Sequence, residues 1–283
     1  MTTNNKRVAL VIGAGSVKCA AALGLWRALE RAGIGLDMVV GCSGGSLYAS
    51  VMALGYDLDT CARLTRELWT PAITKKRATR QILGALFPGL FGFDGKFGMV
   101  DDGAMWAALS GPYGGKRFED ATIPLHIVTT DLHTGEKVVL SSGPVQDAIR
   151  ASIAIPYIWR PWKVGERWLM DGCMSDPLPV DVAIREGANV ILAMGFESPY
   201  PRKLRNGSRY AFHVNSVYTN NLLRANFAFH NLAHHAEIIT VLPEFNRNIG
   251  LFDTDQIPYV IEEGERATQE HLPYLEKLLA GAA

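Results

Sequence analysis

The sequence predicts an α/β fold in which a mainly parallel central sheet is covered by helices on both faces. Three observations predict it. Short apolar runs alternate with segments whose apolar residues recur at helical spacing, as in repeated strand–helix units. The first two runs contain few polar residues, which suits parallel strands buried on both faces. Both of these runs lead into glycine-rich turns that precede a helical pattern.

The first fifty residues carry the pattern most clearly. Residues 8–12 form an apolar run that ends at a glycine, and residues 18–31 then place apolar side chains at helical spacing. Gly33 follows where the C-terminal cap of a helix is expected. We expect a second strand over 37–42 and a second helix over 46–54.

The rest of the chain predicts more of the same elements. Further strands are expected over 125–130, 137–140, 190–195 and 237–242, and further helices over 144–152 and 179–186. Residues 56–120 are helix-rich and irregular, which predicts a helical, lid-like insertion over the sheet and not a separate domain. Residues 255–281 predict a C-terminal helical segment interrupted near Pro273. The whole chain, 1–283, is therefore expected to form one domain.

The composition narrows the classes of function. Lys plus Arg and Asp plus Glu both number 28, so the chain lacks the basic excess that is typical of nucleic-acid binders, and no nucleic-acid partner is expected. The four cysteines, Cys19, Cys42, Cys61 and Cys173, form no CxxC pair and no Cys/His cluster with zinc spacing. We therefore expect neither a metal nor a cofactor, and free thiols in a reducing compartment.

The apolar runs are too short for a membrane-spanning helix, which needs roughly 18 or more apolar residues. The run near the N-terminus breaks at glycines and fits a strand better than a signal peptide. A cytoplasmic location is expected, with peripheral membrane contact possible.

Residues 41–45 read Gly-Cys-Ser-Gly-Gly, a G-x-S-x-G motif between a predicted strand and a predicted helix. A sharp strand-to-helix turn exposes the serine side chain, and Gly41 and Gly45 give the turn room. The N-terminus of the following helix favours negative charge at the serine. The pattern alone is weakly specific, because glycine and serine are common in ordinary turns. Its position makes Ser43 the candidate nucleophile.

The glycine loop at 13–18 has two interpretations. As a dinucleotide fingerprint it fails twice, because Lys18 replaces the third glycine and no acidic residue closes the second strand. As an oxyanion hole it fits better. Adjacent parallel strands bring both glycine turns to one edge of the sheet, so backbone N–H groups of this loop would face Ser43. Lys18 either supports the loop or is an ordinary exposed lysine at a helix start.

A serine nucleophile needs a proton acceptor. By order along the chain, His234 or His235 could complete a histidine triad, but neither lies in a recognisable motif. Asp171 follows a short apolar strand and precedes Gly172. An Asp-Gly pair is also a common hairpin turn, so the residues by themselves leave this choice open.

Four blocks together resemble the patatin-like phospholipase family up to about residue 200. They are the loop 13–18 with its helix, GCSGGS at 41–46, Thr130-Asp131-Leu132 with Thr134-Gly135-Glu136 and residues 147–156, and Asp171-Gly172. The resemblance implies a three-layer fold related to the α/β-hydrolases. It also implies a serine lipid acyl hydrolase, of phospholipase A or lysophospholipase type, that acts on a lipid ester.

The resemblance also implies the roles of individual residues. It implies a catalytic dyad of Ser43 and Asp171 without a histidine. It further implies an oxyanion hole formed by Gly13, Gly15, Ser16 and Val17, and a supporting motif of Lys18, Gly41, Gly45 and Gly172. Two positions depart from the family pattern, because Cys19 and Cys173 stand where small residues, mostly glycine, are usual. An aspartate at its ordinary pKa is a weak base, so we expect burial to raise the pKa of Asp171.

Residues 75–93 combine a basic cluster with an apolar segment broken by glycines and a proline. This pattern fits either a peripheral membrane-docking element or core packing beneath a solvated turn. Two further functions stay open. One is an acyltransferase that uses the same nucleophile, and the other is a nucleotide-binding regulator that uses the loop at 13–18.

Overall fold

The computed structural model describes residues 6–68, 73, 77–197, 200, 203, 207–233 and 236–281. Within these residues, eight strands form one mixed sheet in the order β5-β6-β3-β2-β1-β7-β8, with β4 also paired to β3. The strands are β1 (Val8–Ile12), β2 (Met38–Cys42), β3 (Leu125–Asp131), β4 (Lys137–Leu140), β5 (Trp162–Val164), β6 (Arg167–Asp171), β7 (Val190–Met194) and β8 (Glu237–Val241). Five neighbouring strands of the sheet run parallel, namely β3, β2, β1, β7 and β8. The strands β4, β5 and β6 add antiparallel pairs on the β3 side of the sheet.

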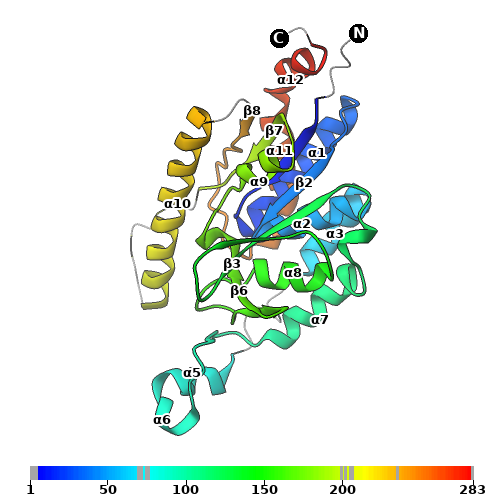
Figure 1. The fold of residues 1–283 in the computed structure, drawn as a ribbon. Helices are drawn as coiled ribbons and strands as arrows, with labels where there is room; N and C mark the ends of the chain where they lie inside the picture. The colour runs from blue at the N-terminus through cyan, green and yellow to red at the C-terminus, as the bar shows by residue number, and fades with distance from the viewer. Residues whose placement is uncertain are drawn as a thin grey trace.

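Helices cover both faces of the sheet (Figure 1). They are α1 (Ala21–Arg31), α2 (Gly44–Ala53), α3 (Leu58–Glu67), α5 (Thr79–Leu86), α6 (Pro88–Phe91), α7 (Asp102–Tyr113), α8 (Val145–Ser152), α9 (Val180–Arg185), α10 (Gly207–Ala233), α11 (Ile257–Gln269) and α12 (Leu272–Leu279). The predicted fold class, a mainly parallel sheet between helical layers, is confirmed.

The two faces follow from the alternation of side chains along each strand. In β1, Leu10 and Ile12 belong to a cluster shared with α1, α2, α8 and α11, whereas Ala9 and Val11 belong to a cluster shared with α9 and α10. Every residue of β1 is buried, so both layers contribute to the core. Parallel strands covered in this way read as uninterrupted apolar runs, which is why the sequence revealed them.

Most predicted elements appear within one or two residues of their expected bounds. A 3₁₀ turn (Ser16–Ala20) separates β1 from α1, so the α-helix begins at Ala21 instead of Lys18. The helix α2 begins directly after Ser43, two residues earlier than expected. Two elements were not predicted, the short strand β5 and the long helix α10.

The region 56–120 contributes α3, α5, α6 and α7, and its residues 69–72 and 74–76 lie outside the described residues. The helix α3 packs against α1 and α2, and α7 packs against α8. In contrast, α5 and α6 project from the body at the end opposite the two chain termini (Figure 1). Within the described residues, α3 and α7 thus belong to the helical layer, whereas α5 and α6 form a projection.

In the C-terminal part, α11 and α12 are separate helices, and Pro273 lies in the first turn of α12. In the part of the chain that the structure describes, no helix is both long and apolar enough to cross a membrane.

Candidate active site

The two glycine turns meet at one edge of the sheet, as predicted. The strands β1 and β2 pair in parallel with Ile12 opposite Gly41, so both turns follow the carboxyl ends of neighbouring strands. The contact is close. A Cβ atom at Gly44 would lie 2.7 Å from the backbone nitrogen of Ser16, and one at Gly45 would lie 2.3 Å from the carbonyl oxygen of Ile12. Only glycine permits this approach.

Ser43 lies between β2 and α2 in a strained conformation, with φ 54° and ψ −128°. Non-glycine residues rarely adopt positive φ, and such strain is typical of a nucleophile elbow. Hydrogen bonds hold the turn on both sides. The Ser43 N–H donates to Ser152 Oγ at 2.9 Å, and the Ser152 hydroxyl in turn donates to the carbonyl of Val128 at 2.7 Å. The side chain of Ser43 is consequently fixed in direction.

Asp171 is the partner of Ser43. The Ser43 hydroxyl donates to Asp171 Oδ2 at 2.7 Å, and the backbone N–H of Cys173 donates to Oδ1 at 2.9 Å. Asp171 is the last residue of β6, and its backbone N–H donates to the carbonyl of Ala154 at 3.1 Å. Thr130 Oγ1 donates to its carbonyl at 2.9 Å. The carboxylate is therefore held on a rigid element, with both oxygens engaged.

Burial controls the charge of this carboxylate. The side chain of Asp171 is fully inaccessible, and loss of solvation raises its pKa from 3.8 to about 6. The hydrogen bonds from Cys173 and Ser43 oppose this shift, because they stabilise the charged form. No basic side chain is among the groups that perturb it. The expected rise in the pKa of Asp171 is thus present in the structure, and desolvation is its cause.

The glycine loop contains both engaged and available N–H groups. Gly13 N–H donates to the carbonyl of Met194 at 2.9 Å, and Ala14 N–H donates to the carbonyl of Pro177 at 2.8 Å. These bonds correct the expectation that Gly13 belongs to the oxyanion hole, because its only donor is used within the fold. Gly13 instead permits close packing, since a Cβ atom there would lie 2.7 Å from the Pro177 carbonyl.

The next three residues of the loop differ from Gly13. Among the described residues, no hydrogen-bond acceptor is seen for the backbone N–H groups of Gly15, Ser16 or Val17. Ser16 also has a positive φ of 52°, and its hydroxyl donates to the carbonyl of Leu251. Ser16 N lies next to Gly44, the residue that follows Ser43. These N–H groups are therefore the candidate donors to an oxyanion.

Lys18 lies behind the loop and helps to line the cavity at Ser43. Its Nζ donates to the carbonyl of Glu197 at 2.9 Å, and burial lowers its pKa. Of the two roles considered for Lys18, these contacts favour support of the loop over an exposed position.

Gly172 is packed as tightly as the glycines of the two turns, because a Cβ atom there would lie 2.3 Å from the Val128 carbonyl.

A cavity of about 520 Å³ opens at Ser43 and Asp171. Its apolar wall includes Ile155, Phe196, Leu223, Ile249 and Leu251. Its polar side is formed largely by one face of α10, which contributes His213, Asn215, Ser216, Thr219 and Asn220. No described residue of 56–120 lines this cavity, whereas α10 lines its polar side. The volume lies in the range of pockets that bind small organic ligands.

The histidines do not contact the dyad in the described part of the chain. His213 lines the cavity, but the hydroxyl of Ser43 donates to Asp171. His234 and His235, the alternative bases, lie outside the described residues. No group of three or more His, Cys, Asp or Glu side chains suited to a metal ion occurs among the described residues.

Sequence reasoning missed Ser152 and the cavity-facing side of α10. Ser152 lies in a block that the resemblance included, but a serine at the end of a helix gives no sign that it bonds to a distant turn. The helix α10 left a clearer signal. Residues 208–236 contain neither glycine nor proline, and Ser216, Asn220 and Leu223 recur at helical spacing.

Comparison of the sequence with known protein families identifies the segment that contains the two turns and Asp171. A family model described as patatin-like phospholipase matches residues 10–184, a range that includes both turns and Asp171. The chain belongs to the patatin-like phospholipase family. This finding confirms the resemblance seen in the sequence.

Individual relatives share about a third or less of their aligned residues with this chain. An uncharacterized NTE family protein of Mycobacterium tuberculosis is 32% identical over 192 residues, which cover 68% of this chain and 49% of that protein. Patatin-like phospholipase domain-containing protein 7 of Mus musculus is 28% identical over 197 residues, which cover 69% of this chain and 14% of that protein. The chain thus spans half or less of the length of these relatives. The crystal structure of VipD from Legionella pneumophila shares the fold, with a TM-score of 0.53 and 14% identity over 95% of this chain and 67% of that one.

Proposed function

We propose that this protein is a serine lipid acyl hydrolase that cleaves carboxylic esters through Ser43 and Asp171. One contact supports this function most directly, the 2.7 Å hydrogen bond from the Ser43 hydroxyl to the buried Asp171 carboxylate. A hydroxyl becomes an effective nucleophile when an adjacent base accepts its proton. With a pKa of about 6, Asp171 is ionised at neutral pH and is a stronger base than an exposed aspartate.

In the proposed reaction, Ser43 Oγ attacks the ester carbonyl carbon while Asp171 accepts the hydroxyl proton. The carbonyl oxygen becomes an oxyanion, which the N–H groups of Gly15, Ser16 and Val17 stabilise by hydrogen bonds. When the intermediate collapses, Asp171 returns the proton to the leaving alcohol and an acyl-enzyme remains. A water then attacks the acyl group, gives its proton to Asp171, and the carboxylic acid leaves as Ser43 regains its proton.

The two sides of the cavity favour an amphipathic substrate. An acyl chain fits the wall formed by Ile155, Phe196 and Leu223, and a polar group fits the hydrogen-bonding face of α10. Phospholipids and lysophospholipids have this division of polarity. The family membership supports the same class of substrate.

An acyltransferase is the second candidate. It would use the same acyl-enzyme but transfer the acyl group to an alcohol or thiol instead of water. The polar lining of the cavity at α10 could hold such an acceptor. Product analysis with and without an added alcohol or thiol acceptor separates the two activities.

A nucleotide-binding regulator is the third candidate. It is disfavoured because Phe196 covers the loop, where a Cβ atom at Gly15 would lie 2.5 Å from its ring. The opposite side of the loop packs against Gly44 and Gly45. Retained nucleotide binding without serine labelling would support it.

The test is covalent labelling with a fluorophosphonate, run beside a panel of lipid esters. We expect wild type to be labelled, and Ser43→Ala to lose both labelling and hydrolysis. Asp171→Asn should lose at least about 10³-fold in kcat, because the proton acceptor is removed while the shape is kept. Ser50→Ala is the matched control, since Ser50 is a buried serine of α2, the helix that follows Ser43, and its hydroxyl donates to the Ser46 carbonyl. Labelling that persists in Ser43→Ala would overturn the proposal.

A further inference from the structure

The segment α5–α6 carries a group of exposed apolar side chains. They are Leu86, Phe87, Leu90, Phe91 and Phe93, and Leu90 is the most accessible at 78%. We call these residues the apolar tip. Large apolar side chains that gather on an exposed projection mark an interaction site, because their exposure to water is energetically unfavourable. Core packing, the alternative interpretation of this segment, does not apply to these residues.

The apolar tip stands on a hydrogen-bonded base. A Cβ atom at Gly84 would lie 2.3 Å from the Gly92 carbonyl oxygen, so α5 and the end of α6 are in close contact. Below them, Ala78 N–H donates to the carbonyl of Met99, and Met99 N–H donates to the carbonyl of Tyr157, both at 2.9 Å. The tip is therefore attached to the segment that runs from Ile155, a lining residue of the cavity at Ser43.

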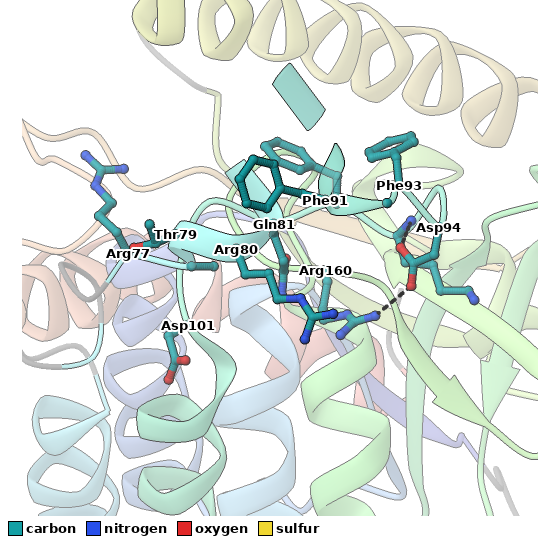
Figure 2. Close-up of a pocket in the computed structure, with 13 residues that line it drawn as sticks. Arg77, Thr79, Arg80, Gln81, Phe91, Phe93, Asp94, Asp101 and Arg160 are labelled. Carbon is teal, nitrogen blue, oxygen red and sulfur yellow. Dashed lines mark hydrogen bonds and ion pairs between the residues drawn. The ribbon is translucent and has the colours of Figure 1, made fainter. Parts of the chain in front are cut away.

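A second cavity, of about 790 Å³, lies between this base and the body of the protein (Figure 2). The charged residues that line it are Arg77, Arg80, Asp94, Lys96, Asp101 and Arg160, so cations outnumber carboxylates. In Figure 2, the rings of Phe91 and Phe93 lie on one side of the cavity, and the side chains of Arg80 and Arg160 extend on the other. We call the cationic lining residues Arg77, Arg80, Lys96 and Arg160 the basic pocket.

The cations of the basic pocket are only partly neutralised. Arg160 pairs with Asp94 at 3.3 Å, and Lys96 Nζ lies 4.2 Å from the centre of the Trp168 ring. Within the described residues, no carboxylate forms an ion pair with Arg77 or Arg80. Lys75 and Lys76, which the sequence placed in the same basic cluster, lie outside the described residues. In the part of the chain that the structure describes, the basic pocket therefore presents more positive than negative charge next to an exposed apolar surface.

Both features lie at the same end of the molecule as the dyad. The chain enters β1 from the end that carries the termini, and α5 and α6 project at the opposite end (Figure 1). The carboxyl ends of the parallel strands, where Ser43 lies, therefore point toward the end that carries the apolar tip. A membrane that touches the tip would therefore face the end of the sheet that carries Ser43.

We propose that the apolar tip and the basic pocket form a docking surface for membranes that contain anionic phospholipid. Phe87 and Leu90 enter the acyl region, while Arg77, Arg80 and Arg160 face the phosphate groups. This order of an apolar end followed by cations matches the layers of an anionic bilayer, whose phosphates lie just outside its hydrocarbon. The proposal rests on the proposed function in taking membrane lipid as the substrate source.

The test measures binding of full-length protein to vesicles by cosedimentation, with Ser43→Ala as the background so that no lipid is consumed. Vesicles of phosphatidylcholine alone are compared with vesicles that also contain phosphatidylglycerol. We expect binding to the anionic vesicles to be at least about tenfold tighter and to weaken as salt is added. Arg77→Gln with Arg80→Gln should remove most of this preference, and Phe87→Ser with Leu90→Ser should weaken binding to both vesicles.

The matched control is Arg63→Gln with Arg66→Gln, which removes two exposed charges from α3, away from the basic pocket. We expect this control to bind as the background protein does, and all variants to keep its thermal midpoint and circular dichroism spectrum. Equal binding to neutral and anionic vesicles would overturn the proposal, as would an equal loss in the control. So would a dimer that dissociates on Phe87→Ser with Leu90→Ser while vesicle binding is unchanged, since the tip would then bind a second copy.

These outcomes are independent of the chemistry at Ser43. If wild type is labelled by fluorophosphonate but the Ser43→Ala background binds neutral and anionic vesicles equally, the docking surface is wrong and the proposed hydrolase is untouched. If the lipid preference appears but labelling is absent, the proposed function fails and the docking surface holds.

Discussion

Ser16 and Ser43 occupy two turns that face each other, and their φ angles are nearly equal. Their φ angles are 52° and 54°, a conformation that is rare for serine, and both residues are buried. Both hydroxyls also donate a hydrogen bond. They differ in the acceptor, because Ser43 donates to the carboxylate of Asp171, whereas Ser16 donates to the backbone carbonyl of Leu251.

This difference decides which serine is the candidate nucleophile. A carboxylate with a pKa near 6 can take a proton at neutral pH, but an amide carbonyl cannot. Strain and burial are therefore shared features of the site, and only the acceptor separates the two serines. In this interpretation the turn at Ser16 supplies N–H groups and the turn at Ser43 supplies the attacking oxygen.

Outside the dyad itself, the largest effect is expected at Gly44, where the two turns touch. A methyl group at Gly44 would lie 2.7 Å from the backbone of Ser16, so Gly44→Ala must push the turns apart. We expect kcat/KM for a soluble ester to fall by about 10²–10³, because oxyanion donors lose their position. Gly35→Ala is the control, since no atom lies within 4 Å of a Cβ there. Unchanged activity in Gly44→Ala would show that the two turns do not act together.

The pH dependence of activity tests the acceptor itself. Asp171 must be ionised to accept the proton, and burial raises its pKa from 3.8 to about 6. As the pH falls through 6, the carboxylate is protonated, so kcat/KM should drop about tenfold for each further pH unit. The measurement is a pH profile on a soluble ester, with the fold checked by circular dichroism at each pH. An acidic limb near 3.8 would contradict a buried aspartate as the base.

The sequence predicted those parts of the fold and site that the backbone itself dictates. Strands buried on both faces must be apolar, and Gly44 and Gly45 must lack side chains because another turn lies against them. Asp171 ends a strand and precedes a glycine whose position admits no Cβ. Such local requirements are visible in the residues and selected Ser43. Asp171 was selected through the family resemblance, because an Asp-Gly pair alone also fits a hairpin turn.

Other features depend on distant acceptors and could not be predicted. Gly13 looked like an oxyanion donor, but its N–H bonds to Met194, far along the chain. The same limit applies to the insertion. Its sequence fits both a lid and a projection, and only the packing of α3 and α7 leaves α5 and α6 exposed. Periodicity gives the faces of an element but not the partner that covers each face.

The smallest effect is expected for Ser16→Gly, which tests whether Ser16 acts through its backbone alone. Glycine adopts a φ of 52° without strain, which gains about 1 kcal/mol. The substitution also removes the hydrogen bond to Leu251, which costs about 1 kcal/mol, so the thermal midpoint should change little. Because the N–H of residue 16 is kept, kcat/KM and the rate of fluorophosphonate labelling should stay within about threefold of wild type, whereas Ser43→Gly should abolish both. A loss of tenfold or more in Ser16→Gly, with the fold intact, would mean that the Ser16 hydroxyl takes part in the reaction and that the two serines are more alike in function than their acceptors indicate.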